Sequence, residues 1–321
     1  MIRFGGGVRA AALCVSVAAL AACGGVDGAP AAQPDKPLSP AQSLHVEVED
    51  ALRAADPCGL LDEASLPGAV LQYGSAVQAS VCSALIRGDD NELTSVDVSL
   101  LPSMLSDSAK TNRTEVGGVT VFRGTGPDLG RGTCERVFAL NLGGLDALQY
   151  ATVRTGANAG QDSCPLADDV VAAAIERMRP GLPLRVDASP WAVDLVGANA
   201  CDVLTAIPEG VRVVDPKQPP TPFDCTFHPD GVETRGNEVS VTLSVKASGG
   251  PDQNAENGPK QVGDRCRWEA RTGEEIDVTR PGAEVDEYAR TLGRARGVVT
   301  VHGPDCDSVR KVADTARLVF G

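Results

Sequence analysis

The sequence predicts an α+β fold of two tandem homologous domains, each an antiparallel sheet flanked by helices and stapled by two disulfides. The separation of Cys58 and Cys82 equals that of Cys201 and Cys225, so the second pair repeats the first at one constant offset. Segments with strand-like alternation recur at matching places, and a cysteine opens a helical segment near the end of each copy. We place the first α+β domain at residues 43–181 and the second at residues 187–321.

The matching segments have the period of half-buried strands, in which every second residue is apolar. The sequence NELTSVDVSLL at 91–101 matches NEVSVTLSV at 237–245, and CERVFAL at 134–140 matches CRWEA at 266–270. We expect Trp268, in the last of these segments, to pack against a disulfide or against the C-terminal helix.

Helices are predicted at the end of each copy, where apolar residues recur at helical spacing. In the first copy, Pro165 stands in the opening turn and Pro180-Gly181 ends the segment, which are positions that these residues favour. The apolar face of this helix contains Leu166, Val170, Ala174 and Met178. The face in the second copy contains Val309, Val312, Ala313, Ala316 and Phe320.

The segment at residues 43–55 fits two structures. Its apolar residues Leu44, Val48, Leu52 and Ala55 have helical spacing, whereas the stretch LHVEVE alternates like a strand.

The first residues predict export and anchoring to a membrane. Arg3 and Arg9 precede an apolar run, which is the layout of a signal peptide at residues 1–22. The run ends in Leu20-Ala21-Ala22-Cys23, which resembles the lipobox of bacterial lipoproteins, so Cys23 is the expected lipidation site. Residues 23–42 then form the lipidated cysteine and an expected flexible tether rich in Gly, Ala and Pro. Ordinary signal cleavage after Ala21 is the alternative.

The cysteines after the tether are even in number, which in an exported chain indicates a disulfide framework. Four cysteines in a domain allow three pairings. The equal separation within the first pair of each copy favours Cys58 with Cys82, Cys134 with Cys164, Cys201 with Cys225, and Cys266 with Cys306. The close CxxC spacing of a zinc site occurs nowhere in the sequence, so we expect no metal and no cofactor.

The charge of the chain limits its partners. A formal net charge of −14 at pH 7 repels phosphate backbones and excludes a groove for nucleic acid. The same acidity argues against adhesion to anionic lipid, so contact with the membrane is expected through the lipid anchor alone. We expect a monomer on the extracellular face of the cell membrane. Its protein partner or small ligand is not identified by the sequence.

Catalytic signatures are absent from the sequence, and we predict no catalytic residue. It lacks the GxSxG and HExxH motifs, and no Ser-x-x-Lys motif is accompanied by its partner motifs. The three histidines, His45, His228 and His302, stand in dissimilar contexts. His228 precedes the turn signal Pro229-Asp230-Gly231, which predicts an exposed side chain.

Two other places are candidates for ligand binding. The Gly-rich stretch at 124–132 lacks the Gly-Lys-Ser/Thr of a phosphate-binding loop, and we expect a hairpin loop there. A ligand site, if one exists, is expected in a cleft between the copies near Trp191.

The residues around the first cysteine of the repeat resemble a known family. The stretch DPCGLL at Asp56 to Leu61, a second cysteine at Cys82 and the lipobox upstream are similar to the actinobacterial lipoproteins grouped as domain of unknown function 3558. An aromatic residue two positions after the second cysteine, frequent in that family, is present as Phe227 and replaced by Ala84 in the first copy. The resemblance implies a surface lipoprotein of a Gram-positive, high-GC bacterium with two compact α+β domains, and it implies no activity.

Together these features favour binding over catalysis. We expect a membrane-anchored extracellular lipoprotein that serves as an interaction or sensor-like accessory module. The alternative is a carrier of a small molecule or lipid with a cavity in or between the domains, and a secreted hydrolase is a third hypothesis. A carrier needs a sizeable apolar cavity, whereas an interaction module presents an exposed apolar patch.

Overall fold

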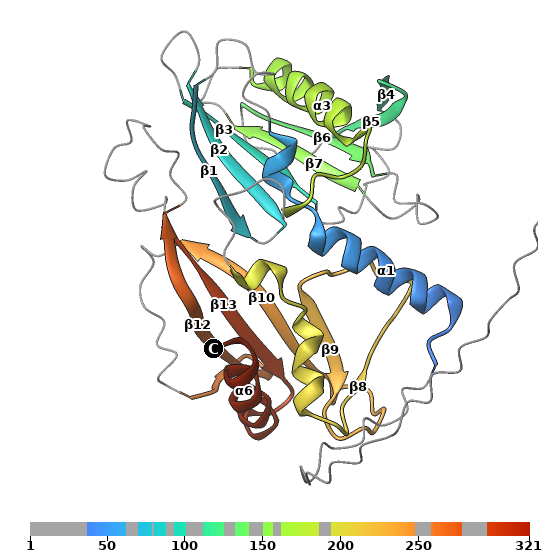
Figure 1. Cartoon of the computed structure of the whole chain (residues 1–321), viewed down its shortest axis with the longest axis vertical. Coiled ribbons are helices and arrows are strands. Elements are labelled where there is room, and N and C mark those ends of the chain that lie inside the picture. The colour runs from blue at the N-terminus through green and yellow to red at the C-terminus, as the bar shows by residue number, and fades with distance from the viewer. Residues whose placement is uncertain are drawn as a thin grey trace, which may run out of the picture. The chain divides into compact units, whose positions relative to one another are not determined.

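Two antiparallel sheets with helices packed against them make up the computed structural model of the chain (Figure 1). The structure describes residues 37–61, 70–78, 80–87, 93–100, 112–124, 132–140, 150–156, 162–185, 194–247, 258–277 and 294–321. We call residues 37–185 the first half and residues 194–321 the second half. The predicted fold class is confirmed, and so is the repeat-like architecture.

The first sheet has seven strands among the described residues, in the order β1-β2-β3-β7-β6-β5-β4. They are β1 (Val70–Gln78), β2 (Val81–Arg87), β3 (Leu93–Ser99), β4 (Arg113–Val116), β5 (Val119–Arg123), β6 (Thr133–Ala139) and β7 (Tyr150–Gly156). Strands β4 and β5 are joined by Gly117 and Gly118, whose positive φ angles of 59° and 85° suit a two-residue hairpin turn. The strand-like patterns in the first copy therefore correspond to β3 and β6.

The second sheet has six strands among the described residues, in the order β11-β12-β13-β10-β9-β8. They are β8 (Val211–Arg212), β9 (Asp224–His228), β10 (Val239–Ala247), β11 (Lys260–Val262), β12 (Arg265–Asp277) and β13 (Arg294–Gly303). The strand-like patterns predicted in the second copy correspond to β10 and β12. Each sheet therefore contains both of the strands that the repeat places in it.

One long helix packs on the central strands of each sheet. Helix α3 (Cys164–Met178) lies on β6 and β7, and α6 (Cys306–Phe320) lies on β12 and β13 (Figure 1). The residues that α3 buries are Ala167, Val170, Val171, Ala174 and Ile175. Those that α6 buries are Val309, Val312, Ala313 and Ala316. Four of the five residues predicted for the α6 face are buried, and Phe320 is partly buried beside them. Leu166 and Met178 are likewise only partly buried at the border of the α3 face.

Residues 43–54 of this segment belong to a helix, α1 (Pro40–Ala54), and Ala55 is its extended C-cap, which forms an isolated β-bridge with Leu184. The reason lies just before the ambiguous segment. Ser39 and Gln42 form a capping box, and Pro40 occupies the first turn, where its missing N–H has no helical partner to lose. These start signals favour the helix over the competing alternation.

Short 3₁₀ helices carry the first cysteine of each half. Cys58 lies in η1 (Pro57–Leu60), and Cys201 lies in η4 (Ala200–Ala206), which follows another short 3₁₀ helix, η3 (Asp194–Gly197).

Four disulfides join these elements within the described residues, two in each half. Cys58–Cys82 and Cys201–Cys225 link a 3₁₀ helix to β2 or β9. Cys134–Cys164 and Cys266–Cys306 link a central strand to the first residue of α3 or α6. These are the pairs that the cysteine spacing favours, and they indicate an oxidising, extracytoplasmic setting for the chain.

The two sheets have the same register. One row across four adjacent strands of the first sheet contains Cys82, Val98, Val153 and Arg136. The corresponding row of the second sheet contains Cys225, Val241, Val301 and Trp268. Because side chains alternate between the faces of a sheet, equal register means that equivalent residues face the same way. The two halves can therefore be compared residue by residue.

Arg136 and Trp268, which hold the same place in this register, contact their helices in opposite ways. Arg136, buried in the first half, donates two hydrogen bonds to the Asp168 carboxylate on α3, at 2.6 and 3.2 Å. In the second half the cation is on the helix, because the Arg317 guanidinium lies 5.2 Å from the centre of the Trp268 ring. The expected packing of Trp268 against the C-terminal helix is confirmed.

Small aliphatic residues dominate both cores. Only Phe138 and Phe227 are aromatic among the largest fully buried side chains of the described residues. A Val or Ala side chain removes less apolar area from water than an aromatic one does. We therefore expect the covalent links to contribute much of the stability.

Removing one strand-to-helix disulfide tests this expectation. Closing a loop of 30 or 40 residues, as Cys134–Cys164 and Cys266–Cys306 do, contributes about 3 to 4 kcal/mol in the chain-entropy model. We expect C134S/C164S and C266S/C306S each to lose a free energy of unfolding of about that size, measured by urea denaturation. Unchanged midpoints in both double variants would contradict the inference.

Candidate functional site

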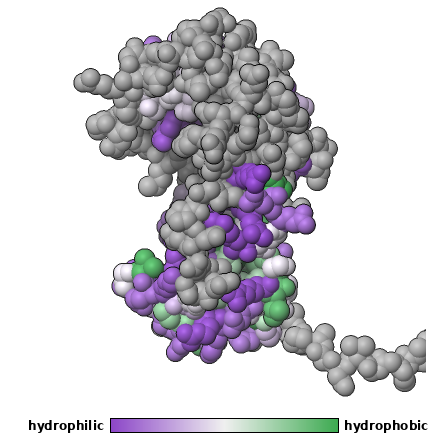
Figure 2. All heavy atoms as spheres, turned by 90° about the vertical axis from the view of Figure 1, so that its left-hand side faces the viewer, coloured by the Kyte–Doolittle hydropathy of each residue, from purple (hydrophilic) through white to green (hydrophobic). Residues whose placement is uncertain are grey.

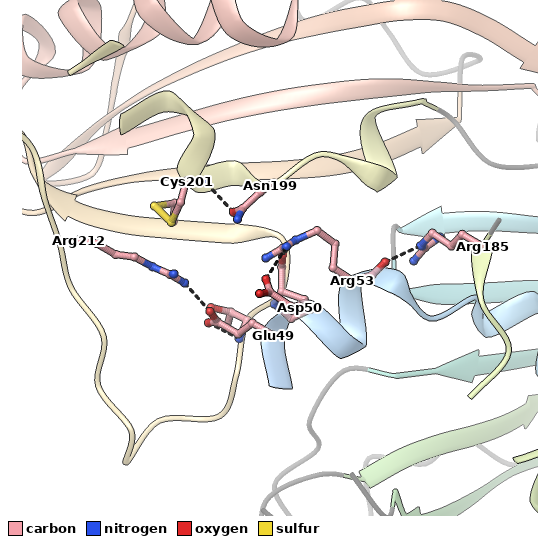
Figure 3. Close-up of polar contacts among 10 residues, drawn as sticks. Glu49, Asp50, Arg53, Arg185, Asn199, Cys201 and Arg212 are labelled. Atoms are coloured by element: carbon pink, nitrogen blue, oxygen red, sulfur yellow. Dashed lines mark hydrogen bonds and ion pairs between the residues drawn. A yellow bond between two sulfur atoms is a disulfide. The ribbon is translucent and has the colours of Figure 1, made fainter. Parts of the chain in front are cut away.

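Helix α1 places a buried carboxylate against the second half (Figure 3). Glu49 is only 4% exposed. Its carboxylate accepts hydrogen bonds from the Arg212 guanidinium on β8 and from the Thr221 backbone N–H, the latter at 3.3 Å. His45 lies one helical turn earlier, with Nε2 3.4 Å from a Glu49 oxygen. A carboxylate is stable out of water only when its oxygens are bonded in this way.

The sequence contains one sign of this contact. The buried residues of α1 are His45, Val48, Glu49 and Leu52, which form a single helical stripe. Two of the four side chains can carry charge, and a charged residue on the buried stripe of a helix predicts a partner on another element. That partner, Arg212, is 163 residues away in the sequence, and no local pattern identifies it.

Further hydrogen bonds attach both ends of α1 to the second half. Near its start the Gln42 side chain donates to the Val214 carbonyl at 3.0 Å. Near its end Arg53 Nε donates to the Pro222 carbonyl at 2.9 Å. The 15 residues of α1 span roughly 22 Å at the usual rise per residue, so the contact extends along the whole helix. We call α1 with these contacts the α1 strap.

Arg185, at the end of the first half, also connects the halves. Its Nε donates to the Arg53 carbonyl at 2.9 Å (Figure 3). Its guanidinium lies 5.6 Å from the centre of the Phe223 ring, and Phe223 belongs to the core of the second half. Arg185 thereby contacts both α1 and the core of the second half.

Asp56 and Asn199 perform the same local task in the two halves. Each side-chain oxygen accepts a hydrogen bond from the backbone N–H of the following cysteine-bearing turn, Cys58 or Cys201, at 2.9 Å. Asp56 is 3% exposed, and its second oxygen has no hydrogen-bond partner among the described residues. Burial raises the pKa of Asp56, opposed by the Cys58 N–H and by the nearby charge of Arg185.

A second polar region covers the face of the second sheet that points away from its core. Along β10, Val239, Val241, Leu243 and Val245 are buried in the core. The alternate residues Ser240, Thr242, Ser244 and Lys246 therefore point to the other face, and the register adds residues of β9, β12 and β13 to them. We call this surface the polar sheet face. Its other members are Asp224, Thr226, Arg267, Glu269, Thr300 and His302.

Charges on the polar sheet face are arranged around Glu269. Lys246 Nζ lies 2.6 Å from one carboxylate oxygen, and Arg267 contacts the other. Although burial acts to raise it, the pKa of Glu269 is lowered by these two cations. On β13, burial and the positive charges of Arg267 and Arg265 lower the pKa of His302, so its imidazole is neutral at pH 7.

Asp224 stands in the same face on β9. Burial raises its pKa, against a hydrogen bond with Thr242 and the nearby His302. A histidine, an acid and the Ser240 hydroxyl are thus near one another. No hydrogen bond joins Ser240 to His302 in the described part of the chain.

The expected exposure of His228 is wrong. The predicted turn is present, with Gly231 at a positive φ of 72°. His228 itself is the last residue of β9, pairs with Val211 of β8 and is only 6% exposed. The turn signal therefore begins at Pro229, directly after β9 ends. The sequence alone does not show β8, the short edge strand that pairs with β9 and covers His228.

Several predicted features lie outside the described residues, namely the signal peptide at 1–22, Cys23, residues 24–36 of the tether, Trp191 and the interior of the Gly-rich stretch at 125–131. The last residues of the predicted tether, 40–42, belong instead to α1. Strands β5 and β6, which flank that stretch, pair antiparallel, as a hairpin requires. Among the described residues no group of three or more His, Cys, Asp or Glu could hold a metal ion. None of the described helices is both long and apolar enough to span a bilayer.

Comparison with known proteins adds no identification. No family model matches the chain, and no curated protein matches it either. Among solved structures, one similarity is to the di-domain ARO/CYC StfQ from the steffimycin biosynthetic pathway, at 10% identity over 83% of this chain and 90% of that chain. Its TM-score of 0.17 supports no argument about fold or function.

Replacing Glu49 tests the α1 strap. We expect Glu49→Gln to lower the free energy of unfolding by about 3 kcal/mol, because Arg212 and His45 lose the carboxylate that compensates their burial. Urea denaturation followed by circular dichroism measures the change. Asp50→Asn is the matched control, since the Asp50 side chain is 55% exposed in its pair with Arg53, and it should change stability by less than about 0.5 kcal/mol. Equal effects of the two variants would refute the assignment.

Asp56 predicts a pH dependence with a definite sign. A folded-state pKa raised above 3.8 gives a contribution to stability that is complete below pH 3.8 and is lost as the pH rises through the folded value. Asp56→Asn keeps the cap, as Asn199 does in the second half. We expect it to be more stable than wild type at pH 7 and equal to it at low pH, in denaturation curves across that range. Asn199→Asp should do the reverse at pH 7.

Proposed function

We propose that the chain is a membrane-anchored extracellular lipoprotein that acts by binding, as an interaction or sensor-like accessory module, and not by catalysis. Four disulfides support an oxidising setting. The Leu20-Ala21-Ala22-Cys23 sequence supports lipidation at Cys23, and the preceding residues support a signal peptide at 1–22. The similarity of DPCGLL to actinobacterial lipoproteins of domain of unknown function 3558 points in the same direction.

The observation that carries the proposal is the place where the tether enters the folded part. Residues after Cys23 lead into α1 at Pro40, and α1 is fixed to the second half by Gln42, Glu49 and Arg53. A lipid on Cys23 would therefore hold both halves at the membrane through one buried set of contacts. A lipid anchor that leads into the α1 strap suits a protein that offers a surface of its folded part to a binding partner.

The surface available for contact supports polar recognition. Of the residues drawn in colour in Figure 2, most are hydrophilic, and the hydrophobic ones occupy small areas, so this face of the described residues does not show the large apolar patch expected of an interaction module. A partner for this side would be bound by hydrogen bonds and ion pairs, with apolar area in a minor role.

Mass spectrometry of the protein extracted from its own membrane tests the proposal. The denatured chain should begin at Cys23, carry a diacylglyceryl group with palmitate-type chains, and lack eight hydrogens for the four disulfides. Cys23→Ser should lose the label from radioactive palmitate and move from the membrane fraction to the medium. A mature chain beginning at Ala22 without lipid would overturn the anchor.

The same sample distinguishes a binding module from a carrier. We expect the native and denatured masses to agree, because an interaction module purifies without a resident small molecule. A reproducible mass that is lost on denaturation would overturn the interaction module in favour of a carrier.

A further inference from the structure

The first half has a row of side chains in which donors and acids satisfy one another. Ser83, Asp97, Arg154 and Glu135 lie opposite one another on β2, β3, β7 and β6, on the face that points away from α3. The Ser83 hydroxyl donates to Asp97 at 2.5 Å, and Arg154 Nη2 donates to Glu135 at 2.7 Å. Each donor in this row has a carboxylate beside it.

The same row in the second half has donors and no acid. Its members are Thr226 on β9, Ser240 on β10, His302 on β13 and Arg267 on β12. Ser240 stands where the first half has Asp97, and Arg267 stands where it has Glu135. The two carboxylates of the first row are therefore replaced by a hydroxyl and a guanidinium.

The donors of the second row are available. Thr226, Ser240 and His302 are partly exposed, and no hydrogen bond reaches their side chains within the described residues. The Arg267 side chain is 37% exposed and gives one nitrogen to Glu269 in the next row. Adjacent strands lie about 4.8 Å apart, so a single small group can contact two or three neighbouring side chains of the row.

The charges around the row favour an anion. Arg265 lies two residues along β12 from Arg267, on the same side of the strand, and both act on His302. Among the described residues, the acids Asp224 and Glu269 oppose these two cations at His302, and the exposed Glu238 interacts with Arg265. Glu269 is already paired with Lys246. This locally cationic row is part of a chain with a formal net charge of −14.

We propose that the row Thr226, Ser240, His302 and Arg267 binds an oxyanion, a carboxylate or phosphate group of an extracellular ligand, in the place that the Asp97 and Glu135 carboxylates hold in the first half. The anion accepts hydrogen bonds from the guanidinium, the imidazole N–H and the hydroxyl. This inference deepens the proposed binding function, but it rests on contacts within the second half and not on the lipid anchor.

A titration of the full chain tests the site. Inorganic phosphate and succinate are added separately at constant ionic strength, and the imidazole NMR signals of His302 are followed, with His302→Gln to assign them. We expect a saturable shift and a higher pKa of His302 with the anion bound, because an adjacent negative charge favours the imidazolium. A response to phosphate, to succinate or to both supports the site, and the pattern identifies the headgroup chemistry.

The first half supplies the decisive variant. Ser240→Asp reproduces the Asp97 arrangement and fills the row with its own carboxylate, so it should weaken anion binding by at least about tenfold. Ser240→Asn introduces a side chain of the same size without the charge and should stay within about threefold of wild type. Absence of a saturable shift with both anions, or equal binding by the two Ser240 variants, overturns the proposal. Cys23→Ser should bind the anions normally, so loss of the anchor and loss of this site are separate results.

Discussion

A disulfide from a central strand to the first residue of a helix is the constraint on which each half depends. It fixes the start of α3 or α6 over one face of its sheet at a position that a small aliphatic core would hold less firmly. The opposite face of each sheet has no equivalent helix among the described elements. The polar rows that contain Asp97 in the first half and Ser240 in the second lie on this opposite face. Each sheet therefore has a helix fixed by a disulfide on one face and polar side chains on the other.

Equal register of four adjacent strands lets the two halves differ in chemistry at equivalent positions. Arg136 with Asp168 and Trp268 with Arg317 are two solutions at one structural position. Asp56 and Asn199 form the same cap, one acidic and one neutral. The same freedom gives the first half a polar row that is complete in itself and the second half a row with donors only. The register of these strands is common to both halves, and the side chains on their polar face differ.

The fold could be predicted from the sequence because its determinants are local or repeated. Cysteine spacing identified the four bridges, and alternation identified the strands that carry Cys134 and Cys266. The polar sites could not be predicted, since they depend on which strands are neighbours. Ser240 and His302 are opposite one another only through the β10–β13 pairing, and the burial of His228 depends on an edge strand too short to leave a pattern. The sequence predicted the stripe Leu44, Val48, Leu52 and Ala55 and did not identify Glu49 or its partner Arg212.

The α1 strap also determines the order in which the chain can reach its final structure. Helix α1 precedes every other described element in the chain, yet Val214, Thr221 and Arg212, which it contacts, follow it by 163 to 172 residues. Contacts of such separation form after local ones, because the intervening loop must close first. Glu49 can lose its water only when β8 has joined the second sheet. Helix α1 therefore completes its contacts with the second half only after that half has placed Arg212, Val214 and Thr221 beside it.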